Sequence, residues 1–399
     1  MKINLLNFKK STLFILYIVG FIFAFTSSIP AYINSSFIES LTSEQAVGIF
    51  FSIGAIFSLF SLIFVPKLLK RFGNYKVTLY LSILYFFNFL GLALFQNIFL
   101  ILLCFLLTGA IAAAIYFNFD IFVEHNSKDM VTGGIRSIYL TCINFAWLFS
   151  PWIAGILVEK YSFRITYLVS ALIMIPIIFI IRSNLKNFID PDYKTFNIIK
   201  TIKSVSNQRN IKNIITSGFL LNFFYSWMVI YGTIYLYKYI GFDFVTGGII
   251  FSIALLPFVL IQIPLGYLAD KKFGEKEILT IGFIIMGFAT ASIPLIHNNS
   301  VILWTLIIFI GRIGAATVEV MNDTYFFKQI DDKNLNIINL YRVAGDLAYI
   351  IAPITAIILL KFIPFNGIFY VLGLLMILGV RYSLALKDTK LNLQSEKLT

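Results

Sequence analysis

The chain has 399 residues, of which 59% are hydrophobic and only 13% are charged. Soluble proteins carry about 25% charged residues, so this composition excludes a soluble domain and indicates a protein that lies in a lipid bilayer. The net charge of +12 would suggest a nucleic-acid partner for a soluble chain, but the basic residues here follow a membrane topology and we expect no nucleic acid.

Twelve apolar stretches are long enough to cross a bilayer, since a transmembrane helix needs roughly 20 apolar residues. The first stretch is too long for a cleaved signal peptide. We therefore predict an all-α membrane protein of twelve transmembrane helices. In chain order they are expected at 11–33, 46–65, 77–95, 98–119, 134–157, 165–182, 213–237, 245–265, 277–295, 301–321, 337–360 and 366–384.

A long polar connector divides these stretches into two sets of six. The sequence repeats across it, because residues 48–53 match 248–253 and Pro151 matches Pro353, an offset of 200 to 202 residues. Two pseudo-symmetric six-helix bundles are expected from such a repeat. We predict an N-terminal bundle at 1–182, a cytoplasmic linker at 183–212, and a C-terminal bundle with a short cytoplasmic tail at 213–399.

Basic residues gather in alternate loops between the predicted spans. They are frequent before the first span, around 67–76, across 182–212, around 271–276 and after 381, and they are few in the other loops. Because positive charge is enriched in the cytoplasmic loops of membrane proteins, we predict a multi-pass protein of the bacterial plasma (inner) membrane with both termini in the cytoplasm.

The sequence contains no pattern that is typical of a catalytic site, a metal site or a cofactor site. Cys104 and Cys142, the two cysteines, both lie in apolar runs, so we expect no disulfide framework and no metal site. There is no glycine-rich phosphate loop, zinc-ligand spacing or nucleophile elbow. We expect a protein that is not an enzyme, takes no cofactor and is not driven by ATP through this chain alone.

One loop carries a recognisable motif. Residues 266–276 run from Gly266 through Leu268-Ala269-Asp270 and a basic residue to Gly274, and a degenerate echo at 67–74 includes Arg71 and Gly73. This pattern resembles the signature loop of the major facilitator superfamily. The resemblance implies a twelve-helix secondary transporter, expected as a monomer, that works by alternating access.

The resemblance also assigns roles to the loop. Gly266 would let the end of the eighth span approach a neighbour, and Gly274 would allow a tight turn before the ninth span. Asp270 would face the start of the fifth span and lock the cytoplasmic gate, because a helix N-terminus favours an anion. Lys271 and Arg136 would join this network. In the first half Leu69 stands at the Asp position, so we expect a weaker lock there.

The fifth and eleventh spans each contain one proline, Pro151 and Pro353. Residues 150–155 resemble weakly a glycine-rich element of the drug/proton antiporter branch, with Ser150 and Ala154 in place of two glycines. Because the proline recurs in both halves, we interpret it as a helix kink that belongs to the repeat.

Three charged side chains are predicted at membrane depth, where charges are costly and usually functional. They are Arg312, Glu319 and Asp346. Arg312 and Asp346 would lie roughly 15 and 12 Å above the cytoplasmic helix ends, so they could form an ion pair, and Glu319 could pair with Arg342 or Lys328. In one interpretation Asp346 or Glu319 carries a proton, and in the other the pair is structural.

A substrate cavity follows from the resemblance, which makes spans 1, 4, 7 and 10 its lining. The polar and aromatic side chains on these spans suggest an amphipathic or moderately polar small-molecule solute. The candidates are Tyr17, Ser27, Thr108, Tyr116, Asn222, Tyr225, Ser226, Trp304 and Arg312, with Asn144, Trp147 and Tyr349 from adjoining spans.

The leading functional hypothesis is therefore secondary active transport, with export of a drug or metabolite in exchange for protons. Uptake of a sugar or another metabolite by symport or uniport is the alternative mode of transport. A third hypothesis is a non-transporting sensor or lipid-handling membrane protein with the same fold. It predicts that neutralising Arg312 or Asp346 leaves activity unchanged, whereas a transporter would lose coupling or binding.

Overall fold

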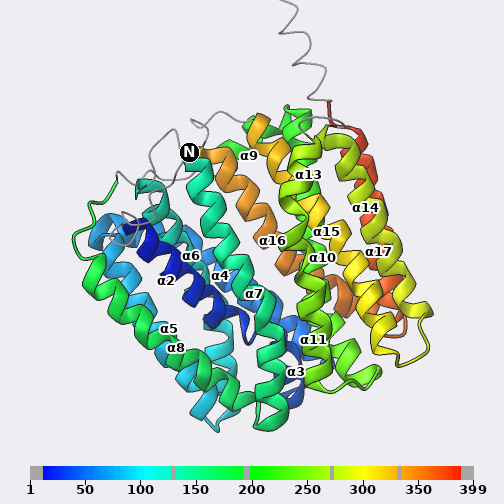
Figure 1. The fold of residues 1–399 in the computed structure, drawn as a ribbon, viewed down its shortest axis with the longest axis horizontal. Helices are drawn as coiled ribbons and strands as arrows, with labels where there is room; N and C mark the ends of the chain where they lie inside the picture. The colour runs from blue at the N-terminus through cyan, green and yellow to red at the C-terminus, as the bar shows by residue number, and fades with distance from the viewer. Residues whose placement is uncertain (1–11, 127–131, 192–197, 270–273, 330–334, 388–399) are drawn as a thin grey trace, which may run out of the picture. The chain divides into compact units, whose positions relative to one another are not determined.

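The computed structural model describes residues 12–126, 132–191, 198–269, 274–329 and 335–387 (Figure 1). Within these ranges the chain forms helices and turns, with no strand. In hydrocarbon a backbone N–H group has no water to bond, and an α-helix satisfies each of these groups within its own segment. The apolar composition and the helical structure are therefore two results of the same constraint.

The first half of the chain contains seven of the described helices. They are α2 (Thr12–Ser28), α3 (Asn34–Leu41), α4 (Glu44–Phe72), α5 (Asn74–Leu94), α6 (Ile98–Asn126), α7 (Thr132–Lys160) and α8 (Phe163–Asn184). Helices α4 and α6 pack along each other, and so do α5 and α8, which Figure 1 shows side by side. α3 falls between two predicted spans and was not expected.

The second half begins with α9 (Ile198–Ser206) and α10 (Arg209–Trp227), which continues as π-helical turns over Met228–Gly232 and Tyr235–Tyr239. The eighth predicted span is broken into α11 (Phe244–Leu255), α12 (Pro257–Leu260) and α13 (Gln262–Leu268). The remaining elements are α14 (Glu275–Ser292), a 3-10 turn (Ile293–Leu295), α15 (Val301–Gln329), α16 (Leu335–Leu359) and α17 (Gly367–Leu384).

Among the described residues, 10 helices are long and apolar enough to cross a membrane. The first and eighth predicted spans correspond to the shorter apolar helices Thr12–Ser28 and Phe244–Leu260. Each predicted span therefore coincides with helix, and the multi-pass membrane class is confirmed. The count of twelve spans stays a prediction.

The chain divides into two compact units. Unit 1 contains Met1–Thr195 and Asp243–Ser252, and unit 2 contains Phe196–Phe242 and Ile253–Thr399. Inside unit 1, the first part of α11 contacts α7 through glycines: a Cβ on Gly155 would collide with the backbone of Phe244, and one on Gly248 with that of Pro151. Small residues permit such close helix contact in membranes.

Each unit also contains the same loop glycine. Gly73 (φ 79°, ψ 156°) stands directly before α5, and Gly274 (φ 82°, ψ 163°) stands directly before α14. This backbone region is essentially restricted to glycine. The carboxylate of Asp190 accepts a hydrogen bond from the N–H of Asn74 (2.7 Å), which ties the residues after α8 to the start of α5.

A second repeated contact joins the first and fifth long helices of each repeat. A Cβ on Gly20 of α2 would collide with the ring of Tyr139 of α7, and a Cβ on Gly218 of α10 would lie 2.8 Å from the ring of Tyr341 of α16. Both members of this glycine–tyrosine contact recur at about the offset of the sequence repeat. The internal repeat is therefore a repeat of packing as well as of sequence.

We predict that Gly73→Ala lowers the free energy of unfolding of the purified protein by about 1 to 3 kcal/mol, because it forces a side chain into a glycine-only backbone region. The new Cβ would also lie 2.5 Å from an oxygen of Asp190. The matched control is Gly54→Ala in α4, whose Cβ would meet nothing within 4 Å. Unfolding in detergent measures both, and equal stability of the two variants would contradict the prediction.

Candidate functional site

In each unit, one side-chain hydrogen bond joins the first and fourth spans of the repeat. In unit 1 the hydroxyl groups of Ser27 on α2 and Tyr116 on α6 lie 2.8 Å apart. In unit 2 the hydroxyl of Tyr225 on α10 donates to a carboxylate oxygen of Glu319 on α15 (2.5 Å). The structure thus brings together four of the predicted site residues, two in each unit.

The polar group of unit 1 extends from this bond onto α7. The indole of Trp147 hydrogen-bonds to the hydroxyl of Tyr116, and Asn144 is half-buried one turn before it. Thr108 is placed differently, because its hydroxyl accepts a hydrogen bond from the amide of Asn88 on α5 (2.8 Å). Thr108 therefore joins α6 to α5 and is engaged in packing.

A separate apolar cavity lies against α2 and α7 in unit 1. It has a volume of about 410 Å³ and is lined by Phe14, Tyr17, Ile18, Phe21, Ile138 and Cys142. The side chain of Tyr17 is only 6% exposed, and its buried hydroxyl has no hydrogen-bond partner among the described residues. Because this hydroxyl is buried, the cavity presents an apolar lining to any molecule that enters it.

In unit 2 the carboxylate of Glu319 is the centre of a cluster of polar groups. Besides Tyr225, the amide of Gln262 on α13 donates to it at 3.4 Å, and the charges of Asp323 and Arg312 act on it. Gln262 was missed in the sequence, although it is the one amide side chain within the predicted eighth span.

Arg312 lies against the aromatic side chains of α10. Its guanidinium carbon is 5.6 Å from the ring centre of Phe224 and 5.7 Å from that of Tyr225. The side chain is 2% exposed, and its Nε and Nη2 atoms are buried without a hydrogen-bond partner among the described residues. Such a cation–π arrangement holds the charge but leaves donors for a further acceptor.

The expected ion pair between Arg312 and Asp346 is not formed. Arg312 turns toward α10, whereas the charge that acts on Asp346 is that of Arg342, four residues earlier on the same helix. One carboxylate oxygen of Asp346 is buried and has no hydrogen-bond partner in the described part of the chain. Membrane depth alone had suggested the pair, and depth does not tell which way a side chain points around its helix.

The expected pairing of Glu319 with Lys328 is also not formed. The amino group of Lys328 contacts the carboxylate of Glu275 at 2.5 Å, and Glu275 is 1% exposed. This pair joins α15 to the first residue of α14. Burial of a carboxylate without a cation would be costly, which explains why Lys328 is held there.

The remaining cavity candidates of unit 2 have different surroundings. Tyr349 on α16 is near enough to interact electrostatically with Tyr225, and the amide of Asn222 donates to the carbonyl of Gly218 (2.8 Å). Trp304 is fully buried, and its indole donates to the carbonyl of Asn298 (2.9 Å) in the loop before α15. Trp304 is therefore a packing residue, away from the Glu319 cluster.

Ser226 shows how the two repeats differ. Its counterpart Ser28 contacts Ser150 of α7, with 2.5 Å between the hydroxyl oxygens. At the position that corresponds to Ser150, α16 has Ala352, and the hydroxyl of Ser226 is buried with no partner among the residues that the structure describes. The contact between these two serine positions is therefore present in unit 1 and has no counterpart among the described residues of unit 2.

Much of the predicted gate lies outside the described residues, namely Asp270, Lys271 and the side chain of Arg136. A Cβ on Gly266 would meet none of the described residues within 4 Å, so the close approach expected there is not seen in the described part of the chain. The guanidinium of Arg71 lies over the ring of Phe72 (5.1 Å). The gate stays a prediction.

The two prolines lie within helices that continue through them, Pro151 in α7 and Pro353 in α16. The carbonyl of Pro353 accepts a hydrogen bond from the hydroxyl of Tyr231 (3.1 Å), which joins α16 to the π-helical part of α10. The N–H of Trp152 donates to the hydroxyl of Ser252 (3.2 Å). Side chains of neighbouring helices therefore bond to the backbone around each proline, as membrane helices require.

We predict opposite effects for the two equivalent serines. Ser28→Ala removes an interhelical hydrogen bond and should lower the free energy of unfolding by about 0.6 to 2 kcal/mol. Ser226→Ala removes a buried hydroxyl that has no partner and should leave stability unchanged or raise it. Thermal unfolding in detergent compares them, and a loss of stability in Ser226→Ala equal to that in Ser28→Ala would show that Ser226 is bonded.

Comparison with known proteins places this geometry in a family. A family model described as Major Facilitator Superfamily matches residues 16–334 and 218–397. Among solved structures, a mutant of the peptide transporter POT in complex with sulfate is similar with a TM-score of 0.77 at 15% identity, over 94% of this chain and 93% of that chain.

Two further structures show the same fold. A mutant of the nucleoside transporter NupG has a TM-score of 0.75 at 11% identity, over 94% of this chain and 99% of that one. A POT family transporter in complex with 5-aminolevulinic acid has a TM-score of 0.75 at 15% identity, over 93% and 95%. No curated protein was found to match the sequence.

Proposed function

Because the chain belongs to the major facilitator superfamily, we propose that it is a proton-coupled secondary carrier of a small organic solute and works by alternating access. The observation that carries the proposal is the cluster of Glu319, Tyr225 and Arg312. It combines a carboxylate, a phenol and a buried cation within predicted membrane spans, and charges at such depth are usually functional.

Glu319 is the proposed proton site. When its carboxylate is charged, it attracts the guanidinium of Arg312 and accepts a hydrogen bond from Tyr225. When it is protonated, the attraction to Arg312 is lost, so an anionic acceptor on the solute no longer competes with Glu319 for the positive charge of Arg312, whose two donors are unpaired. Protonation and solute binding therefore influence each other, which is the thermodynamic requirement for coupling.

Export of a drug or metabolite in exchange for protons is the leading candidate. A solute with an amine would compete with the proton for the carboxylate of Glu319. The ammonium group stabilises the charged carboxylate, whereas the proton neutralises it. The rings of Phe224 and Tyr225 beside Arg312 would give the apolar body of such a solute a surface within the same unit.

Uptake of an anionic solute together with a proton is the second candidate. It is favoured by the unpaired Nε and Nη2 atoms of Arg312, because a planar guanidinium binds a carboxylate or phosphate through two parallel hydrogen bonds. In this case the proton on Glu319 and the anion at Arg312 would move in the same direction.

The same proposal includes the membrane in which the protein lies and the orientation of its termini. The basic residues in alternate loops support a bacterial plasma membrane protein with both termini in the cytoplasm. The predicted division into bundles at 1–182 and 213–399, the roles of the loop around Asp270 and the monomeric state are part of this account.

The test is proton flux in proteoliposomes with a pH-sensitive dye inside and a panel of amines, carboxylates and sugars outside. Exchange makes the interior more alkaline when solute is added, and symport makes it more acidic. Arg312→Gln should reduce the response about 10- to 100-fold, because a hydrogen bond to a charged group contributes about 1.5 to 3 kcal/mol. The matched control is Arg164→Gln, an exposed arginine at the start of α8, which should leave it unchanged.

Two results would contradict the proposal. One is the absence of a response to every solute from folded wild-type protein, which would favour a sensor or lipid-handling role. The other is a full response from Arg312→Gln, which would show that transport does not use this cluster.

A further inference from the structure

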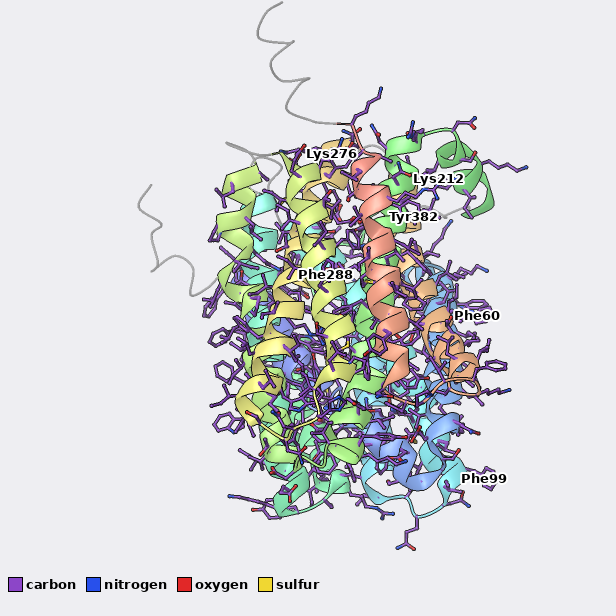
Figure 2. The ribbon with its side chains drawn as sticks, turned by 90° about the vertical axis from the view of Figure 1, so that its right-hand side faces the viewer. Phe60, Phe99, Lys212, Lys276, Phe288 and Tyr382 are labelled. Atoms are coloured by element: carbon purple, nitrogen blue, oxygen red, sulfur yellow. The ribbon has the colours of Figure 1, made fainter. Side chains whose placement is uncertain are left out.

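A basic cavity lies at one end of unit 2, where α9 ends, α10 begins and α17 ends. Its volume is about 500 Å³, and its lining includes Arg209, Lys212, Asn213, Thr216, Arg381 and Tyr382. Figure 2 shows Lys212 and Tyr382 close together near this end, with Phe288 of α14 further along the helices. The distribution of basic loops assigns this end to the cytoplasmic side.

The charges of this cavity have one sign. Arg209, Lys212 and Arg381 contribute three cations, and no carboxylate of the described residues lines the cavity. None of the three cations forms an ion pair with a described acidic residue. The Nδ2 atom of Asn213 is buried without a hydrogen-bond partner among the described residues. The cavity therefore presents positive charge and neutral donors together, a combination suited to the oxygens of a phosphate group.

The surface next to the cavity is apolar. Leu374, Leu378 and Tyr382 follow one another at four-residue steps on α17, so they share one face of that helix. Leu374 is 61% exposed and Leu378 is 59% exposed. On the other side, Ile202 of α9 is 50% exposed. A ligand in this place would meet cations at its head and hydrocarbon surface along its length.

We propose that this cavity binds the phosphate headgroup of an anionic phospholipid, with the acyl chains along Leu378 and Leu374. A free phosphate would use the same cations but not the apolar face of α17. A zwitterionic lipid would bring its own ammonium group to a cavity that already holds three cations, so the site selects lipids with a net negative charge. Basic cavities between transmembrane helices on the cytoplasmic side suit such headgroups. This lipid is a resident ligand of the carrier and is not the transported solute.

The test uses the full-length protein in a neutral detergent, titrated with phosphatidylglycerol, phosphatidylcholine or inorganic phosphate. Native mass spectrometry counts bound lipid, and the midpoint of thermal unfolding reports stabilisation. The cavity variant combines Arg209→Gln, Lys212→Gln and Arg381→Gln. The matched control removes three cations outside the cavity, with Lys70→Gln, Lys186→Gln and Lys276→Gln.

We expect wild type and control to bind one phosphatidylglycerol in preference to phosphatidylcholine and to be stabilised by it. Each cation contributes about a five-fold factor in affinity for an anionic lipid, so the cavity variant should bind phosphatidylglycerol on the order of a hundred-fold more weakly. The single variant Lys212→Gln should bind phosphatidylglycerol about five-fold more weakly. It replaces the triple variant in the test if the triple variant does not fold.

Three results would overturn the proposal. An equal loss of phosphatidylglycerol binding in the cavity variant and in the control would show that net charge alone attracts the lipid. Equal stabilisation by phosphatidylcholine would remove the selection for negative charge. Stabilisation by inorganic phosphate at the same concentration, equal to that by phosphatidylglycerol, would assign the cavity to a soluble phosphate instead of a lipid.

Discussion

The structure depends on the cost of leaving a polar group unbonded in hydrocarbon. Helices satisfy the backbone, and buried polar side chains follow the same rule, as when Thr78, Ser82 and Asn74 bond to one another or to the backbone in the first half of α5. Against this background the unbonded groups stand out, above all the guanidinium of Arg312 and one oxygen of Asp346. Membrane proteins keep such costly groups where the function requires them.

The internal repeat shows what the two halves share and where they differ. Both halves keep the loop glycine and the contact between a glycine of the first span and a tyrosine of the fifth. They differ in the bond between the first and fourth spans, which joins two neutral hydroxyl groups at Ser27 and Tyr116 but includes a carboxylate at Glu319. Both halves therefore share these packing contacts, whereas the bond that includes a charged side chain is in the second half.

The sequence was sufficient to predict the membrane class, the helices and the repeat, because each depends on apolar length and on register along the chain. It also identified Arg312, Glu319 and Asp346, since charge within an apolar run is visible in one dimension. Their partners were not predictable, because a partner depends on rotation about the helix axis. Arg312 therefore lies on Phe224 and Tyr225 instead of meeting Asp346, and Gln262 was missed because its helix is broken and turned toward α15.

The most direct test of the central claim compares two modes of transport for the solute identified by proton flux. One mode is accumulation driven by a pH gradient, and the other is exchange of labelled for unlabelled solute at equal pH. The account predicts that Glu319→Gln loses accumulation by about tenfold or more and retains exchange, while the exposed control Arg164→Gln retains both. Accumulation by Glu319→Gln at the wild-type level would contradict the assignment of the proton site.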